Sequence, residues 1–458
     1  MNGDTIAVPA DSERPAGRSA ARPWLRPAVG VGVALLAELF IVALAAGHAT
    51  ILAPPRTIPF SSWRAGPLQG LLGGFHPNRT ELKIYLLGAM LVMGAGYLLA
   101  LSDARRLPAR WIVAAIVAAH AIVLLAPPLL LTDVYNYIGY AKLGVIHHLN
   151  PYIHVPRAAR HDSIYPYATW HYQATPYGPL FTLATYPLAR LGLPTGVWIL
   201  KAATVLSSLG CVALLAACAR RLGRSPAVCA VAFGLNPLLI VYGVGGVHND
   251  FLMMVVLLAG LLWLLQGRAV AGGAATIAAI GVKLSAAPMA LFVLLSGRPR
   301  RLVAIGAVGA AVLLIALFAI VFGTRAPGLT DQANTITNFS VPDDLATILG
   351  VRATSRCAGH FYPCLNSTVS LITTLAFVAA MLALAWRAFR GADPIACAGW
   401  AGVALILTLA SVMPWYVLWV LPFAALSRSR ALQVTTGVLC LLLLIFGQPT
   451  AHLITYGA

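Results

Sequence analysis

Long apolar runs recur along almost the whole chain, and they limit its possible folds more than any other feature. A run of ~20 apolar residues is long enough for a helix to cross the ~30 Å hydrocarbon core of a bilayer. We expect such helices near residues 28–52, 83–101, 111–131, 196–218, 226–244, 250–265, 269–283, 284–296, 302–322, 366–387, 395–412, 414–426 and 430–447. Because only 10% of the residues are charged and the mean hydropathy is +0.84, a soluble fold is excluded. The sequence therefore predicts an all-α polytopic membrane protein with about 13 transmembrane helices.

The net charge of +18 comes largely from arginines that lie in short clusters between apolar runs. These are Arg105, Arg106 and Arg110; Arg220, Arg221 and Arg224; Arg298, Arg300 and Arg301; Arg387 and Arg390; Arg428 and Arg430. All five clusters fall on the cytoplasmic side if the N-terminus is inside, as the positive-inside rule requires. This pattern indicates a multi-pass protein of the inner (plasma) membrane and excludes a nucleic-acid partner. Residues 1–27 are then a disordered cytoplasmic tail and residues 448–458 an extracytoplasmic one.

This topology places three loops outside, at residues 53–82, 132–195 and 323–365, around one transmembrane domain of residues 28–447. Residues 176–193 would turn the following arginines outward if they formed a full span, so we expect a helix in the outer interface. Five of the seven cysteines lie in apolar helices, where a free thiol behaves as a small hydrophobe. Cys357 and Cys364 lie in the third outer loop, where an oxidising compartment makes a disulfide plausible.

Widely spaced polar residues all fall on the outer side of this topology. They are Asp133, the segment "GVHND" (Gly246 to Asp250), Lys283, Arg325 and the segment "PWYVLW" (Pro414 to Trp419). A carboxylate beside two cations suits transfer of a group from a phosphate leaving group. Lys283 and Arg325 would neutralise the departing phosphate while the carboxylate takes a proton from an attacking hydroxyl. The chain has no P-loop or glycine-rich dinucleotide turn, and we expect no cofactor.

Each of these features also has a purely structural interpretation. Asp133 and the residues His248 to Asp250 could cap helices, and Lys283 could reach the interface with its long side chain. Trp415, Tyr416 and Trp419 fit an aromatic belt at the membrane surface. Five further histidines in the second loop match no ligand spacing, and we expect them to be solvated rather than bound to metal: His147, His148, His154, His161 and His171.

Several motifs together resemble a known family. "DVYNYIGYAKLGVIHHLNPY" is similar to the D-x-Y…G…NPY signature of the GT-C superfamily of polyprenyl-phosphate-sugar-dependent glycosyltransferases. "TPYGPLF", "GVHNDFLMMVVLLAGLL", "GVKLSAAP" and "MPWYVLWVLP" follow in the order typical of the actinobacterial α-1,6-mannosyltransferases of lipoglycan synthesis in the cell envelope. The resemblance covers residues 110 to 425. The chain departs from the pattern in having two spans before Asp133 and no D-x-D pair, so we expect no divalent metal.

The resemblance implies a GT-C-like bundle, a polyprenyl-phosphate mannose donor and a glycan or glycolipid acceptor. Asp133 corresponds to the catalytic base, which deprotonates the acceptor hydroxyl so that it displaces polyprenyl phosphate with inversion. Burial near the lipid boundary is expected to raise its pKa. His248 would either hydrogen-bond the leaving phosphate or orient the base, with Asp250 fixing its tautomer. The remaining substrate-binding residues are expected to be Tyr135, Tyr137, Tyr177, Asn249, Asp250, Lys283, Arg325, Trp415 and Tyr416.

Two other classes fit the hydropathy. A secondary transporter or flippase of a polar or anionic solute would also hold charged residues in the membrane, but such proteins usually carry internal repeats and ionisable residues near mid-bilayer. No convincing repeat relates the two halves of this chain. A structural membrane protein would not explain polar residues gathered on one face. The one-sided set therefore favours the glycosyltransferase.

Overall fold

The computed structural model is mainly helical in the part of the chain that it describes. This part comprises residues 24–325, 333–336, 340–351, 356–357 and 362–447. The expected C-terminal tail and most of the N-terminal one lie outside it, but Trp24 to Pro27 already lead into the first helix. The strands in this part are two residues each, β1 (Arg356–Cys357) and β2 (Tyr362–Pro363), paired antiparallel. The all-α fold class is therefore confirmed.

The helices follow the apolar runs. The first half of the chain forms α1 (Leu25–Ala46), α2 (Ser62–Ala65), α3 (Arg79–Ser102), η1 (Ala104–Arg106), α4 (Ala109–Leu125), α5 (Asp133–Val145), η2 (Pro156–Ala159), α6 (Pro179–Thr185), η3 (Tyr186–Arg190) and α7 (Leu193–Arg221). The second half forms α8 (Pro226–Gly234), η4 (Leu238–Val244), α9 (Asp250–Leu265), α10 (Ala269–Val282), η5 (Leu284–Ala286), α11 (Ala287–Leu294), α12 (Arg300–Phe322), α14 (Val341–Ile348), α15 (Ser367–Phe389), α16 (Pro394–Thr408), η6 (Pro414–Trp419), α17 (Leu421–Leu426) and α18 (Arg430–Phe446).

Five of the helices in the described ranges are long and apolar enough to cross a membrane individually: α1, α3, α7, α12 and α15. The pair α8 and η4 becomes a sixth span if its 50° bend is counted as a break within one crossing. Seven further apolar helices are 10–17 residues long, which is short for a perpendicular span. The structure thus describes a membrane-integral protein, and the expected number of about 13 crossings is not confirmed.

Two helix boundaries differ from the expected ones for local reasons. Helix α3 begins at Arg79 rather than near residue 83, because Asn78 and Glu81 form a capping box that satisfies the first backbone amides. Helix α4 ends at Leu125 rather than near residue 131, because Pro127 and Pro128 disfavour helical backbone in front of them. Asp133 therefore opens a separate helix, α5, instead of a loop directly after a membrane-spanning helix.

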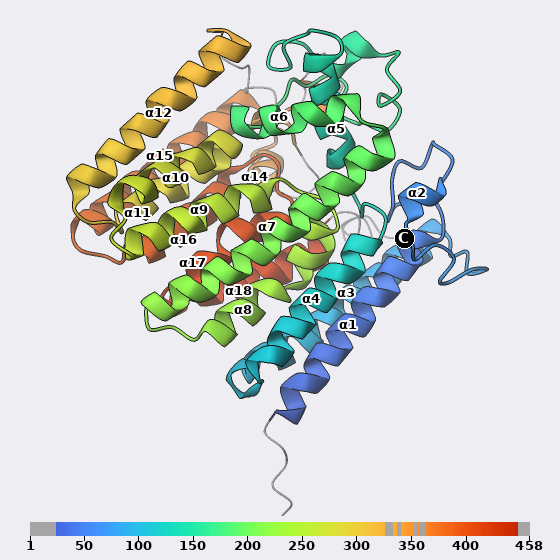
Figure 1. Ribbon diagram of the computed structural model, residues 1–458, viewed down its shortest axis with the longest axis horizontal. Helices are drawn as coiled ribbons and strands as arrows, with labels where there is room; N and C mark the ends of the chain where they lie inside the picture. Colours follow the sequence, from blue (N-terminus) through green and yellow to red (C-terminus); the bar gives the residue numbers. More distant parts are fainter. Residues whose placement is uncertain (1–23, 326–332, 337–339, 352–355, 358–361, 448–458) are drawn as a thin grey trace, which may run out of the picture.

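The helices pack in a bundle, with α1, α3 and α4 together at one side of it. Helix α1 lies along α3 and also contacts α4, while α9 packs between α7 and α10 (Figure 1). Helix α12 packs on α10, and α16 contacts both α11 and α15. The apolar stretches of α12 and α15 are only 11% buried inside the protein. Such exposed apolar faces suit contact with lipid.

The loop 132–195 forms a cap at one end of the bundle, around α5 and α6 (Figure 1). The ambiguous segment 176–193 folds as α6 and η3, of seven and five residues. At 1.5 Å per residue, α6 is about 10 Å long and too short to span a membrane. Both short helices pack on α5, and α6 also contacts α10. In the third loop Cys364 is disulfide-bonded, whereas the side chain of Cys357 lies outside the described residues.

Candidate active site

A bent pair of helices, α8 and η4, leads to His248 at the end of the bundle. Helix α8 and the π-helix η4 are separated by Leu235, Asn236 and Pro237, and the turn after η4 has Val247 at φ 60°. This left-handed conformation is strained for a β-branched residue, and such strain is concentrated at functional sites. Gly246 lies so close that an added Cβ would be 2.2 Å from the carbonyl oxygen of Tyr242 and 2.6 Å from His248 Nε2. The turn therefore requires glycine at position 246.

Asp133 and His248 meet directly. His248 Nδ1 lies 3.1 Å from Asp133 Oδ2, and the indole of Trp170 donates to Asp133 Oδ1 at 3.2 Å. The backbone brings the two segments together, because the amide of Leu129 donates to the carbonyl of Gly245 at 2.8 Å. The His248 side chain is 1% exposed and that of Asp133 17%. Asp133 is therefore the member of the pair that an incoming molecule can reach.

Asp250 and Lys283 form a second pair beside the first. Asp250 opens α9 and is fully buried, and its Oδ2 lies 2.7 Å from Lys283 Nζ at the tip between α10 and η5. The Lys283 side chain is 18% exposed and is therefore the accessible member of this pair. The tip is held by the amide of Gly178, which donates to the carbonyl of Val282 at 3.0 Å. A Cβ at position 178 would lie 2.1 Å from the carbonyl oxygen of Gly281, so this close approach needs glycine.

Three aromatic residues of η6 line the two pairs. The ring of Trp415 stacks on that of His248, with centroids 3.6 Å apart and planes 9° apart. The indole of Trp419 donates to Asp250 Oδ1 at 2.8 Å, and its ring stacks on that of Tyr416. Trp415 and Trp419 are 3% and 2% exposed, so their interpretation as a membrane-surface belt is wrong. They are packing and hydrogen-bonding parts of the charged cluster.

The expected direction of the Asp133 pKa shift is wrong. Burial raises this pKa, but the hydrogen bond and charge of His248, the hydrogen bond of Trp170 and the charge of Lys283 together outweigh burial. The pKa therefore lies below its ordinary value, and the carboxyl group is ionised at neutral pH. The structure also assigns a different partner to His248, because Asp133 and not Asp250 contacts its ring.

Two of the three expected sugar-contacting tyrosines are packed on each other. The Tyr137 ring meets that of Tyr177 edge to face at 4.9 Å. The Tyr137 hydroxyl accepts a hydrogen bond from the backbone N–H of Asn249 at 3.2 Å. Tyr137 and Tyr177 are 2% and 7% exposed. Tyr135 is fully buried and packs near Tyr167 instead. In this conformation none of the three rings presents an open face for a sugar.

Of the other predicted substrate-binding residues, Asn249 and Trp415 lie beside the cluster, whereas Arg325 does not contact it. The side-chain amide atoms of Asn249 and the indole nitrogen of Trp415 are buried next to the cluster without a hydrogen-bond partner among the described residues. Asn249 does not cap α9 with its side chain. Such unpaired groups suit recognition of a hydroxyl-rich ligand. Arg325, by contrast, is exposed beyond the end of α12, and no ion pair in the described ranges joins it to the cluster.

Comparison with known proteins identifies the family of the chain that carries this cluster. Residues 32–298 match the family model described as alpha-(1->6)-mannopyranosyltransferase, N-terminal domain. Residues 346–458 match the MptB C-terminal domain. The chain belongs to the alpha-(1->6)-mannopyranosyltransferase family. The resemblance that the motifs indicated is thereby confirmed, and Asp133, His248 and Lys283 all fall inside the first match.

Relatives of this family member occur in actinobacteria. It is 28% identical to alpha-(1->6)-mannopyranosyltransferase A of Mycobacterium tuberculosis over 360 residues, which are 72% of this chain and 68% of that relative. It is 26% identical to alpha-(1->6)-mannopyranosyltransferase B of Corynebacterium glutamicum, over 68% of this chain and 58% of the relative. A further match is alpha-(1->6)-mannopyranosyltransferase A of Corynebacterium glutamicum, 25% identical over 54% of this chain and 56% of the relative. No solved structure matches.

Two residues of this mannosyltransferase family member were missed by sequence reasoning. Trp170 binds Asp133, and Asn136 Oδ1 accepts hydrogen bonds from the backbone amides of Thr169 and Trp170 at 3.0 and 3.2 Å. Asn136 therefore fixes the backbone that carries the Trp170 indole. An asparagine three residues after Asp133, among tyrosines and apolar residues, was a visible signal, whereas nothing in the local pattern around Trp170 distinguished it.

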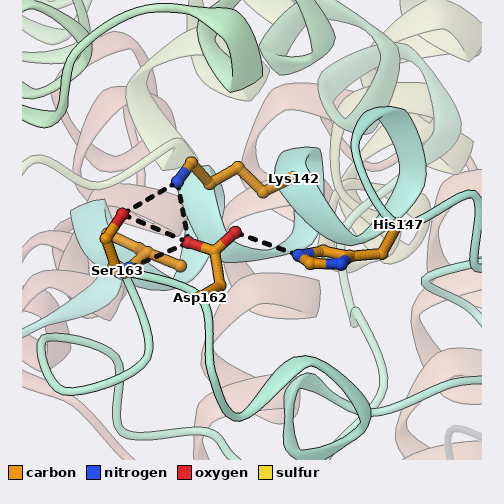
Figure 2. Close-up of polar contacts among 5 residues, drawn as sticks. Lys142, His147, Asp162 and Ser163 are labelled. Carbon is orange, nitrogen blue, oxygen red and sulfur yellow. Dashed lines mark hydrogen bonds and ion pairs between the residues drawn. The ribbon is translucent and has the colours of Figure 1, made fainter.

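A polar cluster ties the loop that carries Trp170 to α5 (Figure 2). Lys142 Nζ lies 2.7 Å from Asp162 Oδ1 and donates to Ser163 Oγ at 3.1 Å. His147 Nε2 lies 2.9 Å from Asp162 Oδ2. Asp162 therefore receives a cation and an imidazole at once, as Figure 2 shows. His147 is thus a loop residue with a structural contact rather than a solvated one.

Replacing Asp162 with asparagine is expected to release this loop. Burial raises the pKa of Asp162, but hydrogen bonds from Lys142, the Ile164 amide and His147 outweigh burial and lower it from 3.8 to about 2. Because the folded-state pKa is lowered, the pairing stabilises the loop fully above 3.8 and is lost only as the pH falls through about 2. Amide hydrogen exchange of the loop, corrected for intrinsic rates, should therefore stay slow from about pH 8 to about pH 4 in the wild type and be fast throughout in Asp162→Asn.

The exposed Asp344→Asn in α14 is the matched control, since it makes the same chemical change away from the loop and should leave exchange slow. Loss of protection in the wild type on acidification to about pH 4 would contradict the assigned pairing.

Proposed function

We propose that this chain transfers a mannosyl residue from a polyprenyl-phosphate mannose to a mannoside acceptor, with inversion, on the extracytoplasmic side of the plasma membrane. The relatives named as alpha-(1->6)-mannopyranosyltransferases support mannosyl transfer and a 1,6 linkage. The observation that carries the mechanism is the meeting of Asp133, His248, Asp250 and Lys283 at one end of the bundle. Of these, Asp133 and Lys283 are the two with partly exposed side chains, which an incoming substrate can reach.

In this mechanism Asp133 is the general base. The acceptor oxygen attacks the anomeric carbon of the donor, and its proton passes to the Asp133 carboxylate. The bond between the anomeric carbon and the phosphate oxygen breaks, and its electron pair leaves with the polyprenyl phosphate. Attack opposite the leaving group converts a β-linked donor into an α-linked product. The lowered pKa keeps Asp133 ionised and therefore able to accept a proton at neutral pH.

Lys283 is the proposed cation for the leaving phosphate. Its ammonium lies 5.8 and 5.9 Å from the rings of Tyr416 and Trp419, and its single carboxylate contact among the described residues is Asp250. This fixed orientation allows it to stabilise charge that develops on the phosphate without reorganisation. Arg325 is not needed in this arrangement.

His248 is assigned the second of its two expected roles, that of orienting the base. Its Nδ1 is engaged by Asp133, whereas Nε2 is buried, has no hydrogen-bond partner among the described residues and lies against Gly246. The Nδ1 contact and the stacking on Trp415 hold the imidazole against the Asp133 carboxylate and fix its orientation. His248 is therefore a positioning residue.

The proposed orientation places the N-terminal tail and the arginine clusters in the cytoplasm. The loops 53–82, 132–195 and 323–365 then lie outside, with α6 and η3 in the outer interface. The acceptor is a mannose-containing glycan or glycolipid of the cell envelope. The domain of residues 28–447 would form one GT-C-like unit.

One assay tests donor, reaction and sidedness together. Sealed right-side-out membrane vesicles carrying the chain receive radiolabelled polyprenyl-phosphate mannose and a water-soluble α-mannoside that does not cross the bilayer. We expect a labelled α-1,6-linked product in the intact vesicles and none in vesicles without the chain. Product formation only after permeabilisation would refute the sidedness. Transfer from GDP-mannose but not from the lipid-linked donor would refute the donor.

A further inference from the structure

A large apolar groove lies on the opposite part of the bundle from Asp133. Its volume is about 630 Å³, within the range of ~300–1,000 Å³ that small-molecule sites occupy. Helices α3, α8, α17 and α18 line it, together with the break between α8 and η4. Leu98 of α3 and Leu441 of α18 are 62% and 54% exposed at its edge. Because both helices are apolar and lipid-accessible, the groove opens toward the hydrocarbon of the bilayer.

One end of the groove is positively charged. Arg224, in the link between α7 and α8, lines the cavity, and its Nη2 donates to the carbonyl of Ser427 at 2.7 Å. Gln433 also lines the cavity and donates to the same carbonyl at 3.0 Å. No ion pair in the described part of the chain includes Arg224. The guanidinium therefore keeps donors for a further anion.

Further arginines surround this end. Helix α7 ends at Arg220 and Arg221, η1 carries Arg105 and Arg106 and packs on α8, and α18 begins at Arg430. A basic end on an apolar groove between membrane helices matches the chemistry of an anionic lipid, whose phosphate and chains need opposite environments. A neutral hydrocarbon would form no ion pair with Arg224.

The groove is separate from the reacting site. Arg224 precedes α8 and His248 follows η4, so the basic end and the charged cluster lie at the two ends of this bent pair of helices. We take the pair as one crossing, which places a phosphate held by Arg224 in the other leaflet from a phosphate held by Lys283. This position excludes the phosphate of a reacting sugar donor.

We propose that this groove binds an anionic glycerophospholipid of the leaflet opposite the active site, with its phosphate on Arg224 and its acyl chains between α3 and α18. Small residues make room for the chains. A Cβ at Gly437 of α18 would meet nothing within 4 Å, and one at Gly94 of α3 would meet only Leu444 Cδ1, at 3.4 Å. The lipid fills the space between two helices that otherwise contact each other little, and it stabilises the folded chain by binding to it.

The test measures the thermal midpoint of the purified full-length chain in an uncharged detergent. Phosphatidylglycerol, phosphatidylcholine with the same acyl chains, inorganic phosphate and polyprenyl phosphate are titrated separately. We expect a saturable rise with phosphatidylglycerol and none with phosphatidylcholine or inorganic phosphate. Arg224→Gln should weaken the apparent affinity about tenfold or more, as expected for loss of a charged hydrogen bond. Gly437→Leu, which fills the groove, should abolish the saturable rise. A rise with polyprenyl phosphate from binding at Lys283 should persist in Arg224→Gln and Gly437→Leu.

Arg301→Gln is the matched control, because it removes the same charge from a helix, α12, that does not line the groove. It should respond to phosphatidylglycerol as the wild type does. If Arg224→Gln fails to fold, Gly437→Leu decides the outcome, since it adds a side chain in open space. An equal rise with phosphatidylcholine, a wild-type response in the folded variants, or a rise with polyprenyl phosphate but not phosphatidylglycerol would overturn the proposal.

Discussion

Asp133→Asn membranes are expected to lose transfer of mannose by about 10²- to 10⁴-fold, the usual contribution of a general base. Asparagine keeps the size of the side chain and can still contact His248 and Trp170, but it cannot take the proton of the acceptor hydroxyl. The KM for the lipid-linked donor should change much less than kcat, because the carboxylate acts on the acceptor. Initial rates with purified chain in lipid, at several donor and acceptor concentrations, measure the two separately.

The pH profile separates the base from its positioning residues. The His248 and Trp170 contacts lower the Asp133 pKa, so Trp170→Phe or His248→Gln should move the acid limb of kcat/KM to higher pH. A purely structural loss would reduce the rate at every pH without moving that limb. Asp344→Asn, an exposed change of the same type, serves as the control and should retain wild-type rates. Wild-type activity in Asp133→Asn would sink the proposed mechanism.

Lys283→Met is expected to lower kcat by about 10²- to 10³-fold, the scale on which removal of one preorganised charge-stabilising group acts. The substitution removes the cation that faces the leaving phosphate. It also leaves the fully buried Asp250 with the Trp419 indole but without its ion pair, so the thermal midpoint should fall. Transfer rates and thermal unfolding of the same preparation measure both effects.

The double variant Asp250→Asn/Lys283→Met distinguishes the two roles of this lysine. Removing both charges eliminates the unpaired buried carboxylate, and the thermal midpoint should recover toward that of the wild type. Transfer should remain low, because no cation is restored. Recovered transfer would mean that Lys283 only neutralises Asp250. Lys83→Met, a change of the same kind at the start of α3 and away from the cluster, is the control and should keep wild-type activity.

Features that depend on residues close together in the sequence were predicted well, whereas features that depend on contacts between distant residues were not. Helix positions depend on local hydropathy, and the apolar runs located the helices well. The end of α4 was misplaced because the run continues through Pro127 and Pro128, where backbone geometry overrides hydropathy. The number of crossings could not be derived, since a 14-residue helix such as α10 has the composition of a span without its length.

Within the site, topology alone was enough to bring Asp133, His248 and Lys283 to one end, but it could not pair them. The partner of each charge depends on side-chain distances across elements that are over a hundred residues apart, such as Asp133 and His248. The direction of the Asp133 pKa shift depended on the same unseen neighbours, because desolvation alone would have raised it. Trp170 required the conformation of a long loop, which the sequence pattern does not specify.

The hydrogen bond from Trp419 to Asp250 joins two positions 169 residues apart. One lies in the matched N-terminal stretch, 32–298, and the other in the matched C-terminal stretch, 346–458. The charges thus come from one stretch, while the indole rings of Trp415 and Trp419, which contact His248 and Asp250, come from the other. The two stretches are consequently not independent modules. Replacing either one with the counterpart of a distant relative would keep this contact only if the tryptophan and its carboxylate acceptor were replaced together.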